Sequence, residues 1–198
     1  LDVACGVGYG SRYLADSGCD VIGVDIDRES IAYAKNRYSD RGNPVFVLSD
    51  AMRIGFDSKT FDVICSFETI EHLENPQLFL QEVKRMLKDN GLFVASTPLV
   101  NVTTSNPTNP FHVQEWNPND FKNMLMKYFD RVEIYSQIRR QTSSSNFLKR
   151  IDILNLRKWL IPNVLVRTVA RMTGIRSMDS VLMDDVDIVD GIVKGASE

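Results

Sequence analysis

Leu1-Asp2-Val3-Ala4-Cys5-Gly6-Val7-Gly8-Tyr9-Gly10 opens the chain, and a helical pattern follows at once over residues 11–17. A short apolar run that contains one acid therefore stops at a group of glycines and turns into a helix. Such a turn presents free backbone N–H groups and the positive end of the helix dipole to a ligand. Glycine carries no side chain that would block the close approach of that ligand. The stretch predicts a nucleotide-type pocket without identifying its ligand.

A second short strand ends in an acid. Val21-Ile22-Gly23-Val24 is rich in β-branched residues and terminates in Asp25-Ile26-Asp27. An acid at the end of the second strand, about 20 residues after the first glycine, is where a doubly wound sheet binds ribose hydroxyls. A dinucleotide fold would use the spacing G-x-G-x-x-G, but Ser11 stands where the third glycine would be. The chain has Gly6-x-Gly8-x-Gly10 instead, with an acid four residues before the first glycine.

This arrangement resembles motif I of the class I S-adenosylmethionine-dependent methyltransferases, specifically the type 11 and ubiquinone-pathway kind, in which D-x-x-C-G-x-G lines the methionine end of the cofactor. Later segments resemble the same family in the same order: Asp50-Ala51 after a third apolar run, Phe61-Asp62-Val63-Ile64-Cys65-Ser66, and Gly91-Leu92-Phe93-Val94-Ala95-Ser96-Thr97-Pro98. The match runs from Leu1 to about Thr97, or about half of the chain. The resemblance implies an α/β fold with a doubly wound, mostly parallel Rossmann-like sheet, and S-adenosyl-L-methionine as the cofactor.

The resemblance also implies which residues lie beside the cofactor. They are Asp2, Ala4, Gly6, Gly8, Asp25, Ile26, Asp50, Ala51 and Phe67. In this family the first acid and the glycines lie on the methionine side, and the acid that ends the second strand binds the ribose. By the same resemblance Ile26 would pack on the adenine and Asp50 would meet its amino group.

Composition limits the class of protein. A chain of 198 residues is long enough to bury a core without disulfides or metal. Its 23 basic and 26 acidic residues are nearly balanced, so nothing indicates nucleic-acid binding. Three cysteines in or beside expected strands predict buried, reduced thiols and a cytoplasmic location. No apolar run is long enough for a membrane span. The chain begins inside an expected strand and stops where a final edge strand is expected, so we expect a fragment truncated at both ends.

The remaining pattern alternates strands and helices. We expect strands near residues 1–4, 20–24, 44–48, 61–66 and 91–96, and helices near residues 9–17, 28–39 and 76–88. Short βα units in this order predict a parallel sheet with helices on both faces. Apolar stripes on two helices are assigned to the core: Ile31, Ala34 and Tyr38, then Phe79, Leu80, Val83 and Leu87. Asn90-Gly91 is expected to end the second of these helices.

The second half of the chain is less regular. Residues 98–117 form a long connection at the carboxyl edge of the expected sheet, where ligands bind in open α/β folds, so we expect a functional loop. Asn117-Pro118 predicts the start of a helix that runs to about Tyr128, and residues 131–138 predict a sixth strand. We divide the chain into a methyltransferase core, residues 1–138, and a C-terminal helical insertion or cap, residues 139–198.

The C-terminal part carries a basic amphipathic pattern. Residues 139–176 hold nine basic side chains against one acid, Asp152, with apolar residues interleaved at helical spacing. One interpretation is peripheral contact with an anionic membrane through residues 147–173, or guidance of a charged substrate. The other is a cap over the active site or a contact between two copies, and the oligomeric state stays open.

The first cluster that could do chemistry is Phe67-Glu68-Thr69-Ile70-Glu71-His72, directly after the fourth strand. Glu68, Glu71 and His72 are spaced to share one helical turn. The segment resembles the E-x-x-E-H of ubiquinone-pathway O-methyltransferases, in some of which these residues hold a divalent cation near the acceptor hydroxyl. The alternative is that Glu71 and His72 only fix the following helix. We expect a catalytic or acceptor-side role and assign no metal.

The second cluster is Asn109-Pro110-Phe111-His112-Val113-Gln114-Glu115-Trp116, in the long loop. It resembles the N-P-x-H-x-x-E-[WY] stretch of bacterial methyltransferases associated with cell-surface polysaccharides. His112 would then act as a base and Glu115 as the acid that orients it, with Phe111 and Trp116 as an apolar wall. In the alternative, His112 bonds a loop carbonyl while Trp116 anchors the loop.

The predicted function is S-adenosylmethionine-dependent O-methylation of a small molecule or glycan. The cofactor carries its own leaving group, so the enzyme needs alignment and a base for an acceptor hydroxyl. Ser66-Phe67-Glu68-Thr69 stands where DNA and protein N-methyltransferases have N-P-P-[YF], which argues against those substrates. The alternatives are an NAD-linked Rossmann oxidoreductase and a cofactor-binding regulator without catalytic activity.

Overall fold

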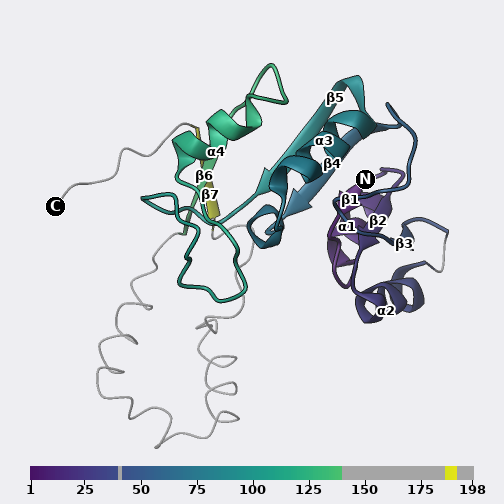
Figure 1. The fold of residues 1–198 in the computed structure, drawn as a ribbon. Helices are drawn as coiled ribbons and strands as arrows, with labels where there is room; N and C mark the ends of the chain where they lie inside the picture. Colours follow the sequence, from purple (N-terminus) through teal and green to yellow (C-terminus); the bar gives the residue numbers. More distant parts are fainter. Residues whose placement is uncertain (40–41, 140–185, 191–198) are drawn as a thin grey trace, which may run out of the picture. The chain divides into compact units, whose positions relative to one another are not determined.

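The computed structural model describes residues 1–39, 42–139 and 186–190 (Figure 1). It divides into two units, residues 1–132 and residues 133–198. In the second unit, β6 (Tyr135–Arg139) and β7 (Val186–Asp190) form an antiparallel pair. The strand expected over residues 131–138 corresponds to β6, whereas the pairing with residues 186–190 was not expected. The expected basic amphipathic segment, residues 147–173, lies outside the described residues.

The first unit is a five-stranded parallel sheet with the order β3-β2-β1-β4-β5. Its elements in chain order are β1 (Asp2–Val3), α1 (Tyr9–Asp16), β2 (Ile22–Asp25), α2 (Arg28–Tyr38), β3 (Val45–Leu48), β4 (Phe61–Phe67), the 3-10 helix η1 (Ile70–His72), α3 (Pro76–Met86), β5 (Leu87–Ser96) and α4 (Pro118–Leu125). The strand order reverses direction between β1 and β4. Open α/β sheets bind ligands at the carboxyl ends of their strands at such a switch point. The predicted doubly wound parallel sheet is confirmed.

Helices cover both faces of this sheet. Phe46, Gly23 and Asp2 lie in one row across β3, β2 and β1, and the row continues to Val94 of β5. In that row Phe46 packs with residues of α2, while Asp2 is hydrogen-bonded to α1. Phe93 precedes Val94, so it points to the opposite face, where its ring lies 6.0 Å from that of Phe79 in α3. The helices α1 and α2 therefore pack on one face and α3 on the other.

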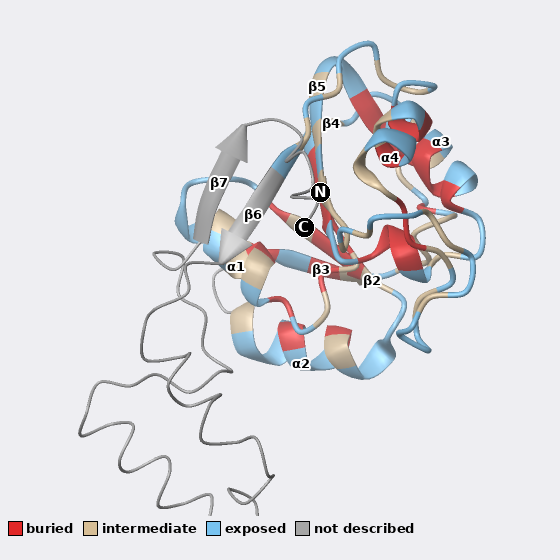
Figure 2. Cartoon of the chain, turned by 90° about the vertical axis from the view of Figure 1, so that its left-hand side faces the viewer, coloured by how far each residue is buried: buried red, intermediate tan, exposed pale blue. Residues whose placement is uncertain are grey.

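The two predicted apolar stripes are buried. Ile31 and Ala34 of α2 pack with Phe46 and Cys5, and Tyr38 is partly buried against them. Phe79, Leu80, Val83 and Leu87 are all buried as well. Figure 2 shows the buried residues of α2 and α3 alternating with exposed ones along each helix, as in amphipathic helices. The expectation of three buried thiols was wrong for Cys19, which is exposed, although all three cysteines are free.

Side-chain caps fix the beginnings of three helices. The Asp27 carboxylate accepts hydrogen bonds from the backbone N–H groups of Glu29 and Ser30 at the start of α2. Asn75 caps α3, and Asn117 caps α4 immediately before Pro118. Each cap satisfies N–H groups that have no partner within the helix. The start predicted at Asn117-Pro118 is confirmed.

The predicted end of α3 was wrong. The helix stops at Met86, and Asn90-Gly91 lies inside β5 rather than in a turn. Two backbone N–H groups of the segment before β4, those of Lys59 and Thr60, donate to the carbonyls of Arg85 and Met86. These bonds occupy carbonyls that the last turn leaves without helical partners, so a tertiary contact and not a glycine ends the helix.

Candidate active site

A cavity of about 340 Å³ lies at the carboxyl ends of β1, β2, β3 and β4. Its wall includes five of the expected cofactor-side residues, namely Ala4, Asp25, Ile26, Asp50 and Ala51. Glu68 and His72 also line it. The volume is in the range of cavities that bind small molecules and cofactors. The ligand position expected from the glycine turn and the acid of the second strand is therefore hollow.

Asp25 and Ile26 present complementary chemistry to this cavity. The Asp25 carboxylate accepts a hydrogen bond of 2.8 Å from the Gly6 N–H and another of 2.8 Å from the Asp27 N–H. Each carboxylate oxygen keeps acceptor capacity, as ribose hydroxyls require. The Ile26 side chain is 72% exposed, so it offers an apolar surface on which an adenine ring can pack.

The other four expected cofactor-side residues, Asp2, Gly6, Gly8 and Phe67, do not line the cavity. Asp2 is buried, and its carboxylate accepts a hydrogen bond of 2.6 Å from the Ser11 hydroxyl. Burial raises the pKa of Asp2, and the Ser11 hydrogen bond opposes that shift. In this structure Asp2 therefore joins β1 to α1 beneath the glycine turn. Ser11, which the spacing marked only as a missing glycine, is its partner.

Glycine is required at positions 6 and 8 for different physical reasons. Both have positive φ, which favours glycine. A Cβ atom on Gly6 would meet nothing within 4 Å, as expected where a ligand approaches the backbone. A Cβ atom on Gly8 would lie 2.7 Å from the Phe46 ring and 2.8 Å from the Ala34 Cβ. The explanation by ligand approach therefore fits Gly6, whereas Gly8 is required by the packing of the turn on α2 and β3.

Glu68 follows β4 in a strained backbone conformation. Its φ is +50°, a region that side chains other than glycine rarely adopt. Its backbone N–H donates to the Ser96 carbonyl, and its carboxylate accepts a hydrogen bond of 2.6 Å from the Ser96 hydroxyl. Such strain persists only where the surroundings hold it, and it clusters at functional sites. Ser96 at the end of β5 is thus the residue that holds Glu68 in place.

Glu71 is the buried centre of the neighbouring cluster. Its side chain is fully buried, and Oε2 accepts a hydrogen bond of 3.0 Å from the Thr97 hydroxyl. Within the described part of the chain, Oε1 has no hydrogen-bond partner. Burial is the main cause that raises the pKa of Glu71. Its backbone carbonyl accepts from the N–H groups of Val113 and Gln114, so η1 and the long loop are joined at this residue.

One ring nitrogen of His72 is hydrogen-bonded to the long loop, and the other is available to bind a proton. Nδ1 lies 2.8 Å from the Phe111 carbonyl oxygen. Because a carbonyl only accepts, Nδ1 carries the proton and Nε2 of the neutral ring carries a lone pair. Nε2 lies 4.0 Å from Glu71 Oε1, and the His72 side chain is 41% exposed. The ring is thus oriented by the loop and accessible from the cavity.

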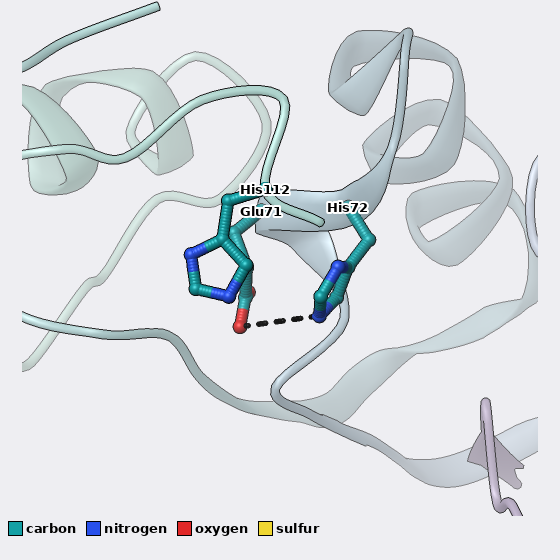
Figure 3. A group of neighbouring side chains, drawn as sticks. All are labelled: Glu71, His72 and His112. Atoms are coloured by element: carbon teal, nitrogen blue, oxygen red, sulfur yellow. Dashed lines mark ion pairs between the residues drawn. The ribbon is translucent and has the colours of Figure 1, made fainter. Parts of the chain in front are cut away.

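His112 is oriented by a carboxylate. Its Nδ1 lies 2.5 Å from Glu115 Oε1, and its Nε2 accepts from the Asn109 amide at 2.8 Å. The rings of His72 and His112 are 4.8 Å apart and nearly perpendicular. Glu71, His72 and His112 therefore form one group, in which one donor atom of each lies within 4.8 Å of the others (Figure 3).

This grouping differs from the two clusters that the sequence indicated. Glu71 and His72 are brought together with His112 of the loop, whereas Glu68 is turned to Ser96. Glu115 pairs with His112 as expected, and the alternative bond of the His112 ring to a loop carbonyl is not what the structure has. The roles of these residues in catalysis stay predictions.

Phe111 and Trp116, the two loop residues expected to form an apolar wall, differ in burial. Trp116 is buried, with its ring 5.9 Å from that of Phe121 in α4, so it anchors the end of the loop. Phe111 is 77% exposed. Reciprocal backbone hydrogen bonds of 2.9 Å between Thr104 and Glu115 close the loop on itself. The exposed Phe111 ring is therefore the one available to a ligand.

Sequence reasoning missed Ser96 and Thr97 as site residues, although both lay in the segment that resembled the fifth strand. The sequence could have indicated both residues, because they are polar and lie at the carboxyl end of an expected parallel strand, where ligands bind. It also missed Met52 and Leu73, which line the cavity. No helix among residues 1–39 and 42–139 is both long and apolar enough to span a membrane.

Comparison with known proteins agrees with this geometry. The family model described as a methyltransferase domain matches residues 1–95. A probable S-adenosylmethionine-dependent methyltransferase of Mycobacterium tuberculosis is 32% identical over 130 residues, which cover 64% of this chain and 46% of that protein. A ubiquinone biosynthesis O-methyltransferase of Azorhizobium caulinodans is 33% identical over 98 residues, covering 49% of this chain and 39% of that protein. The chain thus spans less than half the length of these relatives.

Solved structures share the fold. A crystal structure of an S-adenosylmethionine-dependent methyltransferase from Mesorhizobium loti superimposes with a TM-score of 0.56 at 16% identity, covering 78% of this chain and 83% of that one. The strand order, the cavity at the switch point and the family match over residues 1–95 lead to one conclusion. Residues 1–95 match the methyltransferase domain family, and the chain shares the fold of class I S-adenosylmethionine-dependent methyltransferases, whose cofactor is S-adenosyl-L-methionine.

Proposed function

We propose that the protein transfers the methyl group of S-adenosyl-L-methionine to a hydroxyl oxygen of a small molecule or glycan. One observation carries the proposal: a single cavity is lined at once by Asp25 and Ile26, which suit a nucleoside, and by Glu68 and His72, which suit proton handling. The cofactor and an acceptor hydroxyl can therefore meet in one place. The name of the O-methyltransferase relative from Azorhizobium supports oxygen as the acceptor atom.

Alignment is the first contribution of the protein. S-adenosyl-L-methionine supplies a methyl group on a positively charged sulfur that is itself the leaving group. Asp25 would hold the ribose hydroxyls, Ile26 would contact the adenine face, and Asp50 would accept from its amino group. Fixing the reacting atoms in line supplies much of the rate enhancement in such a displacement.

Proton removal is the second contribution. A hydroxyl oxygen becomes a strong nucleophile only as its proton leaves, so the acceptor needs polar groups beside the methyl carbon. The group of Glu71, His72 and His112 supplies them, and only His72 of the three lines the cavity. We assign the acceptor hydroxyl to the His72 side of this group, with the exposed Phe111 ring as an apolar contact for the acceptor.

Calorimetry with S-adenosylhomocysteine tests the cofactor, with NAD as the competing ligand. Micromolar binding of the homocysteine product that is lost in Asp25→Ala supports the proposal, whereas binding of NAD alone supports the oxidoreductase alternative. Dihydroxybenzoate and diaminobenzoate of the same substitution pattern then test the acceptor atom. Methylation of the first and not the second is expected, and the reverse would contradict an oxygen acceptor.

The regulator alternative needs a separate test. His72→Gln and His112→Gln leave the Asp25 end of the cavity intact, so both variants should still bind S-adenosylhomocysteine. If methyl transfer falls in both while binding is retained, a non-catalytic regulator is excluded. A biological output that survives the loss of transfer would instead favour the regulator.

Four expectations about the whole protein remain proposals. We place it in the cytoplasm, with a small-molecule or glycan acceptor and no nucleic-acid partner. Peripheral membrane contact through residues 147–173 is tested by flotation with anionic vesicles, and absence of binding would remove it. Sedimentation analysis would give the oligomeric state.

A further inference from the structure

We propose that the Glu68 carboxylate recognises the positive charge on the sulfur of S-adenosyl-L-methionine, so that the cavity binds the charged cofactor more tightly than S-adenosylhomocysteine, whose sulfur is neutral. The inference rests on the part of the proposed function that assigns Asp25 to the ribose. It gives Glu68 a role in selecting the cofactor and releasing the product, which is separate from proton removal at the acceptor.

The wall of the cavity carries negative charge. Four carboxylates line it, those of Asp25, Asp50, Glu68 and Glu74, and no Lys or Arg among the described residues does. None of the four forms an ion pair within the described part of the chain. Carboxylates are charged at neutral pH, and a cleft lined by one sign of charge attracts ligands of the opposite sign. The cavity is therefore suited to a cation.

The order of the strands sets the position of Glu68 along the cavity. Asp50 follows β3, Asp25 ends β2 and Glu68 follows β4, with β1 between β2 and β4. The adenine and the sulfur are attached to opposite sides of the ribose ring. An adenine at the β3 end and a ribose on Asp25 therefore direct the sulfur toward β1 and β4. Glu68 comes directly after β4, so its carboxylate borders the cavity on the side to which the sulfur is directed.

The Glu68 carboxylate is held in place and keeps one oxygen free. Oε1 accepts a hydrogen bond of 2.6 Å from the Ser96 hydroxyl, and the Glu68 N–H donates to the Ser96 carbonyl at 3.1 Å. Oε2 makes no hydrogen bond within the part of the chain that the structure describes. A sulfonium has no hydrogen to donate from sulfur, so it is recognised by charge. A fixed carboxylate provides that charge without reorganising, and a bound ligand strengthens the attraction by displacing water.

Methyl transfer removes the charge that Glu68 recognises. The acceptor oxygen forms the new O–C bond while the C–S bond breaks, and the electron pair of that bond stays on sulfur. The hydroxyl proton leaves on the His72 side, so one positive charge is lost from sulfur and one proton is released. The attraction between Glu68 and the sulfur ends with this step, which favours release of the product. Product release limits turnover in many enzymes.

Calorimetry of the full chain, without any acceptor, tests this recognition. S-adenosylhomocysteine keeps the ammonium and carboxylate groups of the methionine part, so the comparison isolates the charge on sulfur. S-adenosyl-L-methionine should bind at least about fivefold more tightly than S-adenosylhomocysteine. Sinefungin, an analogue with an ammonium group in place of the methylated sulfur, should show the same preference. Equal or tighter binding of S-adenosylhomocysteine than of both cations would overturn the inference.

Two substitutions at Glu68 separate charge from shape. Glu68→Gln removes the charge and keeps an oxygen that can accept from Ser96. It should weaken S-adenosyl-L-methionine binding at least about fivefold and leave S-adenosylhomocysteine binding unchanged, which also shows that the domain is folded. Glu68→Asp keeps the charge, and aspartate tolerates a φ of +50°, so it should keep the preference. If Glu68→Gln weakens both ligands equally, Glu68 contacts a group that they share, and the inference is wrong.

A matched control tests whether the effect is local. Glu29→Gln makes the same change of net charge on the first turn of α2, at a residue that does not line the cavity. The ratio of the two dissociation constants should stay as in the native chain. A fall in that ratio as large as the one in Glu68→Gln would assign the preference to the overall charge of the protein and overturn the role of Glu68.

Activity distinguishes this inference from the function on which it rests. A chain that prefers the charged ligands through Glu68 but methylates no hydroxyl acceptor keeps the inference and overturns the oxygen acceptor. A chain that methylates a hydroxyl and binds the charged and neutral ligands equally keeps the proposed function and overturns the inference. Inhibition by S-adenosylhomocysteine gives a kinetic readout, since its inhibition constant should exceed the KM of the cofactor and the two should converge in Glu68→Gln.

Discussion

The backbone N–H of Gly6 donates a hydrogen bond of 2.8 Å to the Asp25 carboxylate, which joins the turn after β1 to the end of β2. These two strands are neighbours in the sheet, and their ends form one wall of the cavity. The residue assigned to the ribose is thus held by the turn assigned to the methionine end. A substitution at either residue should therefore weaken the contacts of the protein with both the ribose and the methionine end of the cofactor.

Asp25→Asn should weaken S-adenosylhomocysteine binding by about 10- to 100-fold, because a hydrogen bond to a charged group is worth about 1.5–3 kcal/mol. The amide also keeps only one acceptor oxygen for the N–H groups of Gly6 and Asp27. Asp27→Asn is the matched control, since asparagine caps helices as well as aspartate and residue 27 does not line the cavity. Isothermal titration of both variants with S-adenosylhomocysteine measures the two losses of affinity. Equal losses in the two would contradict the assignment of the ribose to Asp25.

Gly8→Ala should lower the free energy of unfolding by about 2–4 kcal/mol, since alanine at φ +83° is strained and its Cβ would overlap Phe46 and Ala34. Gly10→Ala should be neutral or raise the free energy of unfolding by up to about 1 kcal/mol, because Gly10 lies in α1. Its added Cβ would meet only the Asp2 carboxylate, at 3.7 Å. Urea unfolding of the pair measures the difference. Similar values for both variants would refute the packing explanation of Gly8.

Asp2→Asn should stabilise the domain at neutral pH relative to the native chain, and the advantage should shrink in acid. Burial raises the pKa of Asp2 in the folded state above the ordinary value of about 3.9. The unfolded chain therefore loses this proton first, and the native protein loses stability as pH rises from the ordinary pKa to the raised one. Asparagine does not titrate and can still accept from Ser11.

Urea unfolding of the native chain and of Asp2→Asn at about pH 4 and about pH 7.5 measures this effect. The difference in free energy of unfolding between the two proteins should grow toward the higher pH. Ser11→Ala removes the hydrogen bond that lowers the Asp2 pKa, so it should destabilise the domain more at the higher pH. A difference that shrinks as pH rises would mean that Asp2 gains from being charged.

Arg85→Lys should lower the free energy of unfolding by about 1–3 kcal/mol. The guanidinium of Arg85 donates to the carbonyls of Phe56 and Ile54 at 2.7 and 3.0 Å, and lysine cannot reproduce this two-pronged geometry. Lys59→Met breaks the exposed ion pair with Asp89 and should change the free energy of unfolding by less than about 0.5 kcal/mol. Thermal and urea unfolding compare the two. A larger effect from the exposed pair would contradict this ranking.

Local pattern was enough for several parts of this fold. The apolar spacing of Ile31, Ala34 and Tyr38 correctly gave the inner face of α2, because helical period and burial are both local properties. Asn117-Pro118 gave the start of α4 for the same reason. The alternation of strands and helices gave the parallel sheet, since short βα connections allow few other arrangements.

Features that depend on distant partners were not predictable in this way. The end of α3 is set by backbone N–H groups of Lys59 and Thr60, far away in sequence. The meeting of Glu71 with His112 depends on how the long loop closes onto η1, and no periodicity encodes that closure. The requirement for glycine at position 8 comes from Phe46 of β3, which is separated from it by α1, β2 and α2. In each case a tertiary contact overrides or adds to what the local residues specify.

The irregular start of β5 has a consequence for variation in length. Pairing with β4 moves from Phe61–Leu87 to Val63–Leu92, so four residues of β5, 88–91, stand against the single residue Asp62 of β4. At the other end of the strand, Ser96 bonds Glu68 and the next residue, Thr97, bonds Glu71. Because successive strand residues point to opposite faces, losing one residue that shifts the register would exchange the directions of Ser96 and Thr97. A change of length that is absorbed within residues 88–91 should therefore leave both contacts intact, whereas one that moves the pairing of residues 92–96 by one residue should break both.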